Sequence, residues 1–106
     1  MNLHWEKRSW GNACEIHVVG TADLAAEPAL KRLERLLRKE RDIVLNVAGL
    51  EYADTTFLRF LLRVRSREGS GNEVRVTLTD VSPRLQRILE ITGLSPIFTY
   101  QTPQQA

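Results

Sequence analysis

The segment Asp54-Thr55-Thr56 places a carboxylate and two hydroxyls at the predicted start of a helix. It follows an apolar strand, and loops after the carboxyl ends of strands in open α/β sheets are where ligands and partners usually meet the fold. The first turn of a helix also offers unpaired N–H groups and the positive end of the helix dipole. Two roles are open for this segment: Asp54 or Thr55 caps the helix, or the hydroxyl takes part in chemistry.

Patterns typical of catalysis are missing elsewhere. Gly69-Ser70-Gly71 precedes a predicted strand rather than a helix, so it does not form a phosphate-binding loop. No serine or cysteine has a base and an orienting acid at a recognisable spacing. Phosphorylation of Asp54 would need further carboxylates at an early strand end and a lysine from a late strand, but no lysine follows Lys39. We therefore predict that the chain is not an enzyme.

Length and composition predict one small domain. The chain has 106 residues with 42% hydrophobic content, enough for one core over residues 1–106 with a polar tail from about residue 101. No apolar run approaches the ~20 residues that span a bilayer, and the N-terminus has no signal-peptide pattern, so we expect a cytoplasmic protein without membrane insertion. With one cysteine, Cys14, and two histidines, neither a disulfide, a metal centre nor another cofactor is expected.

The basic residues do not indicate a nucleic-acid partner. The net charge is +2, and thirteen acidic residues offset fifteen basic ones. The arginines and lysines fall largely on predicted helices, without the one-sided basic stripe and interleaved aromatics of a nucleic-acid interface. We interpret them as solvated helix faces.

The hydrophobic pattern predicts an α/β fold. Two alternating runs around Gly11-Asn12 indicate an antiparallel hairpin, and strands alternating with helices then indicate parallel βα units in a mixed sheet flanked by helices. The almost continuously apolar strand at residues 43–47 is expected to be covered by helices on both faces. The predicted strands cover residues 3–10, 13–19, 43–47, 74–79 and 97–100, and the predicted helices cover residues 24–39, 55–66 and 82–93. Ser82-Pro83 predicts a capped start of the third helix, and Gly93 predicts a left-handed terminator at its end.

The apolar stripes of the first two helices identify the expected core. Leu30, Leu33 and Leu37 recur at helical spacing, and Leu36 widens this stripe. In the second helix the expected core residues are Leu58, Leu61 and Leu62. Phe57 and Phe60 exceed what one stripe requires, which leaves two roles open for them: packing against a neighbouring helix, or exposed contacts for a partner.

Several short motifs, in their joint order and spacing, resemble a STAS domain, the fold of bacterial anti-sigma factor antagonists and of sulphate-transporter tails. The resemblance runs from about Cys14 to Tyr100. It implies a STAS-like mixed β-sheet, with an N-terminal antiparallel hairpin followed by parallel βα units and flanked by helices. The motifs are Gly20-Thr21-Ala22-Asp23, Val44-Leu45-Asn46-Val47, Tyr52-Ala53-Asp54-Thr55-Thr56-Phe57-Leu58, Gly71-Asn72-Glu73-Val74, Val81-Ser82-Pro83 and Ile91-Thr92-Gly93-Leu94.

This resemblance implies a partner-switching protein with Thr55 as the phosphoacceptor. In such antagonists the Ser or Thr after the aspartate is phosphorylated by an anti-sigma factor that is itself a serine/threonine kinase, and a metal-dependent PP2C-type phosphatase resets it. Unphosphorylated antagonist binds the kinase and frees the sigma factor. Asp23, Asp54 and Thr56 are then the neighbours of the switch residue.

The chain departs from the family pattern next to the acceptor. Phe57 stands where the family usually has glycine, and Arg59 and Phe60 stand where small residues are common. We therefore predict that Phe57, Arg59 and Phe60 contact the partner. Two alternative functions stay open: a STAS subunit of a lipid-transporting ABC ATPase complex, and a STAS scaffold protein that is not phosphorylated.

Overall fold

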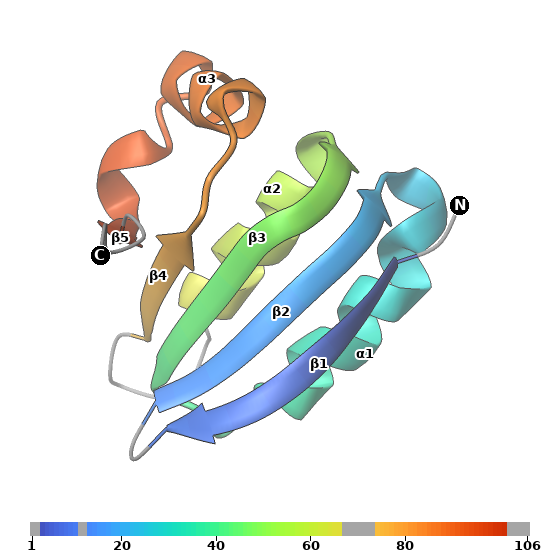
Figure 1. Cartoon of the computed structure of the whole chain (residues 1–106), viewed down its shortest axis with the longest axis vertical. Helices are drawn as coiled ribbons and strands as arrows, with labels where there is room; N and C mark the ends of the chain where they lie inside the picture. The colour runs from blue at the N-terminus through green and yellow to red at the C-terminus, as the bar shows by residue number, and fades with distance from the viewer. Residues whose placement is uncertain (1–2, 11–12, 67–73, 102–106) are drawn as a thin grey trace.

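The computed structural model describes residues 3–10, 13–66 and 74–101, which form one mixed sheet with helices packed against it (Figure 1). The hairpin strands β1 and β2 are antiparallel and every later pair is parallel, which confirms the predicted fold class. The predicted turns at Gly11-Asn12 and Gly69-Ser70-Gly71 and the polar tail beyond Gln101 lie outside the described residues. In sheet order the strands are β1 (Leu3–Trp10), β2 (Ala13–Ala22), β3 (Asp42–Ala53), β4 (Arg75–Thr79) and β5 (Thr99–Gln101).

Local signals in the sequence set the helix ends. Pro28 lies in the first turn of α1 (Glu27–Leu36), which follows the 3-10 turn η1 (Leu24–Ala26). Ser82 caps α3 (Pro83–Ile91): its Oγ accepts a hydrogen bond from the amide of Leu85 at 3.1 Å. Gly93 has φ +76°, which confirms the predicted left-handed terminator. The remaining helices are α2 (Thr55–Arg65) and the 3-10 turn η2 (Ser95–Ile97).

The core lies between the sheet and the helices α1 and α2, which both lie behind the sheet in Figure 1. Strand residues alternate between the two faces of the sheet, so each central strand contributes every second side chain to this core. The core side chains of the two central strands are Cys14, Ile16 and Val18 from β2 and Ile43, Leu45 and Val47 from β3.

The other face of the sheet is open, so the prediction that residues 43–47 are covered on both faces is wrong. Val44 and Asn46 are only half-buried there, and no helix of the described residues lies in front of this face in Figure 1. The physical reason is that β-branched residues such as Val44 favour any strand, including one with a half-exposed face. A continuous apolar run therefore did not require burial on both sides.

Two leucines were also placed wrongly in the core. Leu36 is 43% exposed, and Leu62 is half-buried. Each lies directly beside a fully buried residue: Leu36 precedes Leu37 and Leu62 follows Leu61, and both of these neighbours are at 0% exposure. Adjacent helical residues point about 100° apart, so a stripe that already buries Leu37 or Leu61 turns the neighbouring side chain towards its margin.

Strand β3 extends well beyond residue 47, and its pairing with β2 continues to Ala53 across two irregularities. The register shifts between His17 and Val19 and again between Gly20 and Thr21. Gly20 has φ +115°, a conformation that favours glycine. A Cβ at Gly49 would lie 3.0 Å from the Val19 side chain and 3.3 Å from the Val18 carbonyl, so the close approach of the strands there favours glycine.

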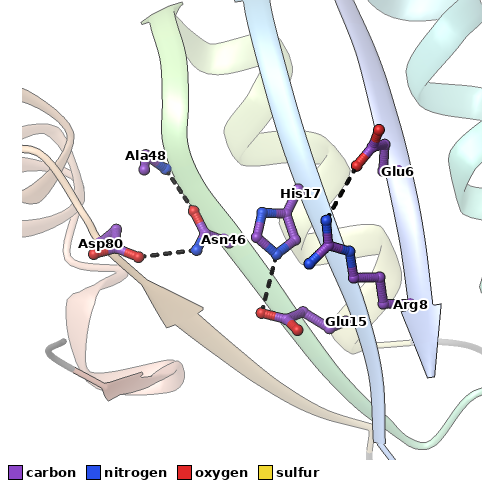
Figure 2. A network of polar contacts seen from close by, with 7 residues as sticks. All are labelled: Glu6, Arg8, Glu15, His17, Asn46, Ala48 and Asp80. Carbon is purple, nitrogen blue, oxygen red and sulfur yellow. Dashed lines mark hydrogen bonds and ion pairs between the residues drawn. The ribbon is translucent and has the colours of Figure 1, made fainter. Parts of the chain in front are cut away.

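The side chain of Asn46 lies on the open face of the sheet and stabilises the backbone of β3 at the first register shift (Figure 2). Its Oδ1 accepts a hydrogen bond from the amide of Ala48 at 2.9 Å, and its Nδ2 donates to Asp80 Oδ2 at 2.9 Å. Asp80 has φ +58°, an uncommon backbone conformation for a residue other than glycine. One amide therefore links the irregular part of β3 to the segment between β4 and α3.

We expect the Asn46→Asp variant to be less stable by about 1–2 kcal/mol at neutral pH, because it replaces a donor to Asp80 with a second carboxylate. Urea unfolding measures this difference. The matched control is Glu6→Gln on the same sheet face, where the ion pair with Arg8 is exposed and its loss should change stability by less than about 0.5 kcal/mol. Equal stability of Asn46→Asp and the wild type would contradict the role given to Asn46.

Candidate functional site

Strands β2 and β3 end side by side and bring two sequence-distant loops together. Ala22 of β2 pairs with Ala53 of β3, and the amide of Asp54 donates to the carbonyl of Ala22 at 3.3 Å. Asp23 and Asp54 directly follow this last pair, so two of the three predicted neighbours of Thr55 lie at one edge of the sheet. In Figure 1 this edge is the upper end of β2 and β3, next to the starts of η1 and α2.

Asp54 caps α2 with both its side chain and its backbone. Its Oδ1 accepts the amide of Thr56 at 2.8 Å, and its carbonyl accepts the amides of Phe57 at 3.0 Å and Leu58 at 3.3 Å. Its backbone is extended, with φ −128° and ψ −161°, as an N-cap residue requires. The structure therefore confirms the capping role for Asp54 and shows that the amides of Thr56, Phe57 and Leu58 already have acceptors.

The two threonines that follow the cap differ in their exposure to solvent. Thr55, the first residue of α2, is exposed, whereas Thr56 is 2% exposed. Successive helical positions differ by about 100°, so one threonine faces solvent and the next faces the sheet. Thr55 therefore offers a side chain that a second protein can reach, while Thr56 belongs to the protein interior.

The prediction that Phe57 and Phe60 contact a partner is wrong, because both side chains pack in the core. Both rings are 0% exposed, and they stack with centroids 5.9 Å apart. With Leu61 and Val64 they form the stripe of α2 that packs against the sheet, at the spacing i, i+3, i+4 and i+7. These two side chains cannot contact a partner in the folded protein, whereas Arg59 is exposed between them.

Two exposed apolar side chains at this edge were missed in the sequence. Leu24, in the turn after Asp23, is 69% exposed, and Tyr52, two residues before Asp54, is 45% exposed. The register pairs Thr21 with Tyr52, so Tyr52 lies near the end of β3 and Leu24 follows the end of the neighbouring strand β2. A signal was available for Leu24, since it lies outside the stripe of Leu30, Leu33 and Leu37. None was available for Tyr52, because the irregularities of β3 decide which face it takes.

A small groove continues this edge towards α3. It lies between the end of β3 and the start of α3, and Glu51 and Arg84 are its charged lining residues. The half-buried side chains of Leu50 and Ile88 form part of its wall, together with the exposed Tyr52. The surface around Thr55 is thus a mixture of carboxylates, arginines and apolar side chains.

The residues that the structure describes contain no group of three or more His, Cys, Asp or Glu side chains that could hold a metal ion. Cys14 and His17 lie on opposite faces of β2, as their spacing predicts: Cys14 is buried, and burial raises the pKa of its thiol, while His17 faces the open side (Figure 2). None of the helices within residues 3–10, 13–66 and 74–101 is long and apolar enough to cross a membrane.

We expect Asp54→Ala to destabilise the protein by about 1 kcal/mol, because the Thr56 amide loses its side-chain acceptor. Asp54→Asn is the matched control: it keeps an oxygen at the same position and should retain most of this stability. Urea unfolding of both variants measures the effect. If the two substitutions cost the same, the side-chain cap does not stabilise α2.

Sequence comparisons relate the chain to a known family and to curated relatives. A family model described as "Mlab, STAS domain" matches residues 5–99. An anti-sigma-B factor antagonist of Staphylococcus aureus is 29% identical over 99 residues, which covers 92% of this chain and 91% of that protein. The corresponding antagonist of Staphylococcus epidermidis is 28% identical over 99 residues, with the same coverage of 92% and 91%.

Solved structures of similar fold include anti-sigma factor antagonists. One from Mycobacterium paratuberculosis has a TM-score of 0.81 at 18% identity, covering 97% of this chain and 87% of that one. The antagonist SpoIIAA in its unphosphorylated form has a TM-score of 0.74 at 17% identity, covering 96% and 90%. The phosphorylated form of SpoIIAA from Bacillus has a TM-score of 0.69 at 18% identity, covering 96% and 93%. At these identities the likeness establishes the fold.

Proposed function

The chain belongs to the STAS domain family, and we propose that it is an anti-sigma factor antagonist whose partner binding is controlled by phosphorylation of Thr55. The observation that carries this proposal is the placement of one accessible hydroxyl. Thr55 is exposed directly after the capping Asp54, and Thr56 beside it is buried. The curated relatives named anti-sigma-B factor antagonists and the SpoIIAA structures in two phosphorylation states support it.

The proposed partner is an anti-sigma factor that is also a serine/threonine kinase. It transfers the γ-phosphoryl group of ATP to Thr55 Oγ1: a new O–P bond forms, the bond to ADP breaks, and the hydroxyl proton passes to a base on the kinase. A PP2C-type phosphatase hydrolyses the product and restores the hydroxyl. The antagonist itself binds and is modified, and it supplies no catalytic group.

The charge of the phosphate explains how modification ends binding. It adds about −1.5 to −2 charge beside the carboxylate of Asp54 and near Asp23. In the isolated protein this charge faces water, so the fold is kept. In a docked interface it is desolvated, and an uncompensated buried charge costs about 3–5 kcal/mol. At about 1.4 kcal/mol for each tenfold change, the affinity falls by roughly two to three and a half decades.

Leu24 and Tyr52 are the proposed apolar contacts of this interface, in place of the buried Phe57 and Phe60. They are exposed at the same strand ends that present Thr55, and exposed aromatic and aliphatic side chains beside a functional residue favour a protein partner. The three carboxylates Asp23, Glu51 and Asp54 outnumber the two exposed arginines Arg59 and Arg84 around this edge, which favours a partner surface with basic residues around an apolar centre. The exposed Arg59 lies on α2 next to this surface.

Incubation with the cognate kinase and ATP should add one phosphate to the wild type and none to Thr55→Ala. Intact-mass and fragment-ion spectrometry measure the number and position of phosphates. Thr56 serves as the internal control, because its burial in the folded protein should keep it unmodified. An unchanged mass, when a serine-acceptor antagonist is modified in parallel, would contradict the proposal. Co-purification with a transporter ATPase and no kinase would support the transporter-subunit alternative instead.

Thr55→Glu should bind the partner about tenfold more weakly or worse than Thr55→Gln, because the two side chains differ mainly in charge. Calorimetric titration of both variants isolates the charge effect from the change in side-chain size. Far-ultraviolet circular dichroism should show the same fold for both. Equal affinities would contradict control by charge.

Leu24→Ser and Tyr52→Ser should each weaken partner binding by about tenfold or more, in line with the loss of an apolar contact at an interface. Ile91→Ser is the matched control, since Ile91 is 74% exposed at the far end of α3 from the capping Ser82. Surface plasmon resonance with the immobilised partner measures the dissociation constants of all three variants. If Ile91→Ser has the larger effect, the interface lies elsewhere on the molecule.

A further inference from the structure

We propose that Arg59 binds the phosphate on Thr55, so that modification also withdraws an exposed guanidinium from the partner-binding surface. This inference rests on the proposed phosphorylation of Thr55 and concerns how this chain receives the modification.

The geometry of α2 brings the two side chains together. Thr55 is the first residue of α2 and Arg59 lies four positions later, and both are exposed. Helical residues four apart have Cβ atoms about 5–6 Å apart, and an anion followed by a cation in this order is the favourable arrangement. Because helical side chains lean towards the N-terminus, the long arginine side chain reaches back over the first turn.

The start of α2 offers the phosphate few backbone donors. The amides of Thr56, Phe57 and Leu58 already donate to Asp54, the first to its carboxylate and the other two to its carbonyl. A phosphate at Thr55 would have to displace the Asp54 carboxylate to use the Thr56 amide. A side-chain cation is therefore the available source of charge compensation within the protein.

Other arginines of α2 are engaged elsewhere. Arg63 Nε donates to Glu34 at 2.8 Å, and its Nη2 lies 3.7 Å from Glu27. Arg65 Nε donates to the carbonyl of Ile97 at 2.9 Å. In contrast, none of the ion pairs found within residues 3–10, 13–66 and 74–101 involves Arg59. Its planar guanidinium can bind a phosphate through two parallel N–H···O bonds.

Arg84 is the control for Arg59, because it is a second exposed arginine near Thr55. It is exposed at the start of α3 and lines the groove next to Tyr52 and Ala53, one residue from Asp54. It therefore lies in the same neighbourhood but on a different element. A phosphate that simply attracts any nearby cation would respond to Arg84 as well, whereas helical spacing singles out Arg59.

The test measures the second pKa of the phosphate by phosphorus NMR in the full chain. Phosphothreonine is incorporated at position 55 during translation, so the experiment needs no kinase. A nearby cation favours the dianion, hence Arg59→Gln should raise this pKa by about 0.2–0.4. Arg59→Lys should give an intermediate value, and Arg84→Gln should leave the pKa unchanged.

An unchanged pKa in Arg59→Gln, or a larger rise in Arg84→Gln, would overturn the assignment. Arg59 is exposed, so its substitutions should fold, and circular dichroism checks this. The result is separable from the proposed function. A pKa rise in Arg59→Gln together with no phosphorylation by any kinase would support the ion pair and contradict the proposed regulation. An unchanged pKa together with phosphorylation of Thr55 by the kinase would contradict the ion pair and support the proposed regulation.

Discussion

The hydrogen bond from the Thr56 amide to the Asp54 carboxylate is the constraint on which the site depends. It fixes the first residue of α2 and thereby decides which of two adjacent threonines reaches solvent. The stacked rings of Phe57 and Phe60 anchor the same helix from its buried side. The cap and the aromatic pair together hold the Thr55 side chain outward on a rigid element, where an enzyme can approach it.

The irregular pairing of β2 and β3 delivers this helix start to the sheet edge. Gly20 takes the positive φ at the second register shift, Gly49 leaves room for the Val19 side chain, and Asn46 satisfies the Ala48 amide at the first shift. After both shifts Ala22 and Ala53 are paired again, so Asp23 and Asp54 follow at the same level. The open polar face of the sheet thus contributes to the site indirectly, through the backbone that it supports (Figure 2).

Local chemistry made much of the fold predictable from the sequence. The caps at Asp54 and Ser82, the terminator at Gly93 and the hairpin depend on neighbouring residues, and the structure confirms the first three together with the antiparallel pairing of the hairpin strands. Burial depends on tertiary packing, and there the prediction was less accurate. Surplus apolar residues on α2 suggested surface contacts, but Phe57 and Phe60 fill the space between helix and sheet. Likewise, the exposure of Tyr52 follows from two register shifts that the hydrophobic pattern does not encode.

In the proposed mechanism, one phosphate on an exposed side chain ends a protein–protein contact without unfolding the protein. The decisive experiment measures the dissociation constant for the anti-sigma factor with the unmodified chain and with the chain carrying phosphothreonine at position 55, together with amide NMR spectra of both free proteins. The phosphorylated chain should bind with an affinity about 100-fold or more lower, with amide shifts confined to the residues around the start of α2. Equal affinity, or a loss of affinity accompanied by loss of the folded spectrum, would contradict this mechanism.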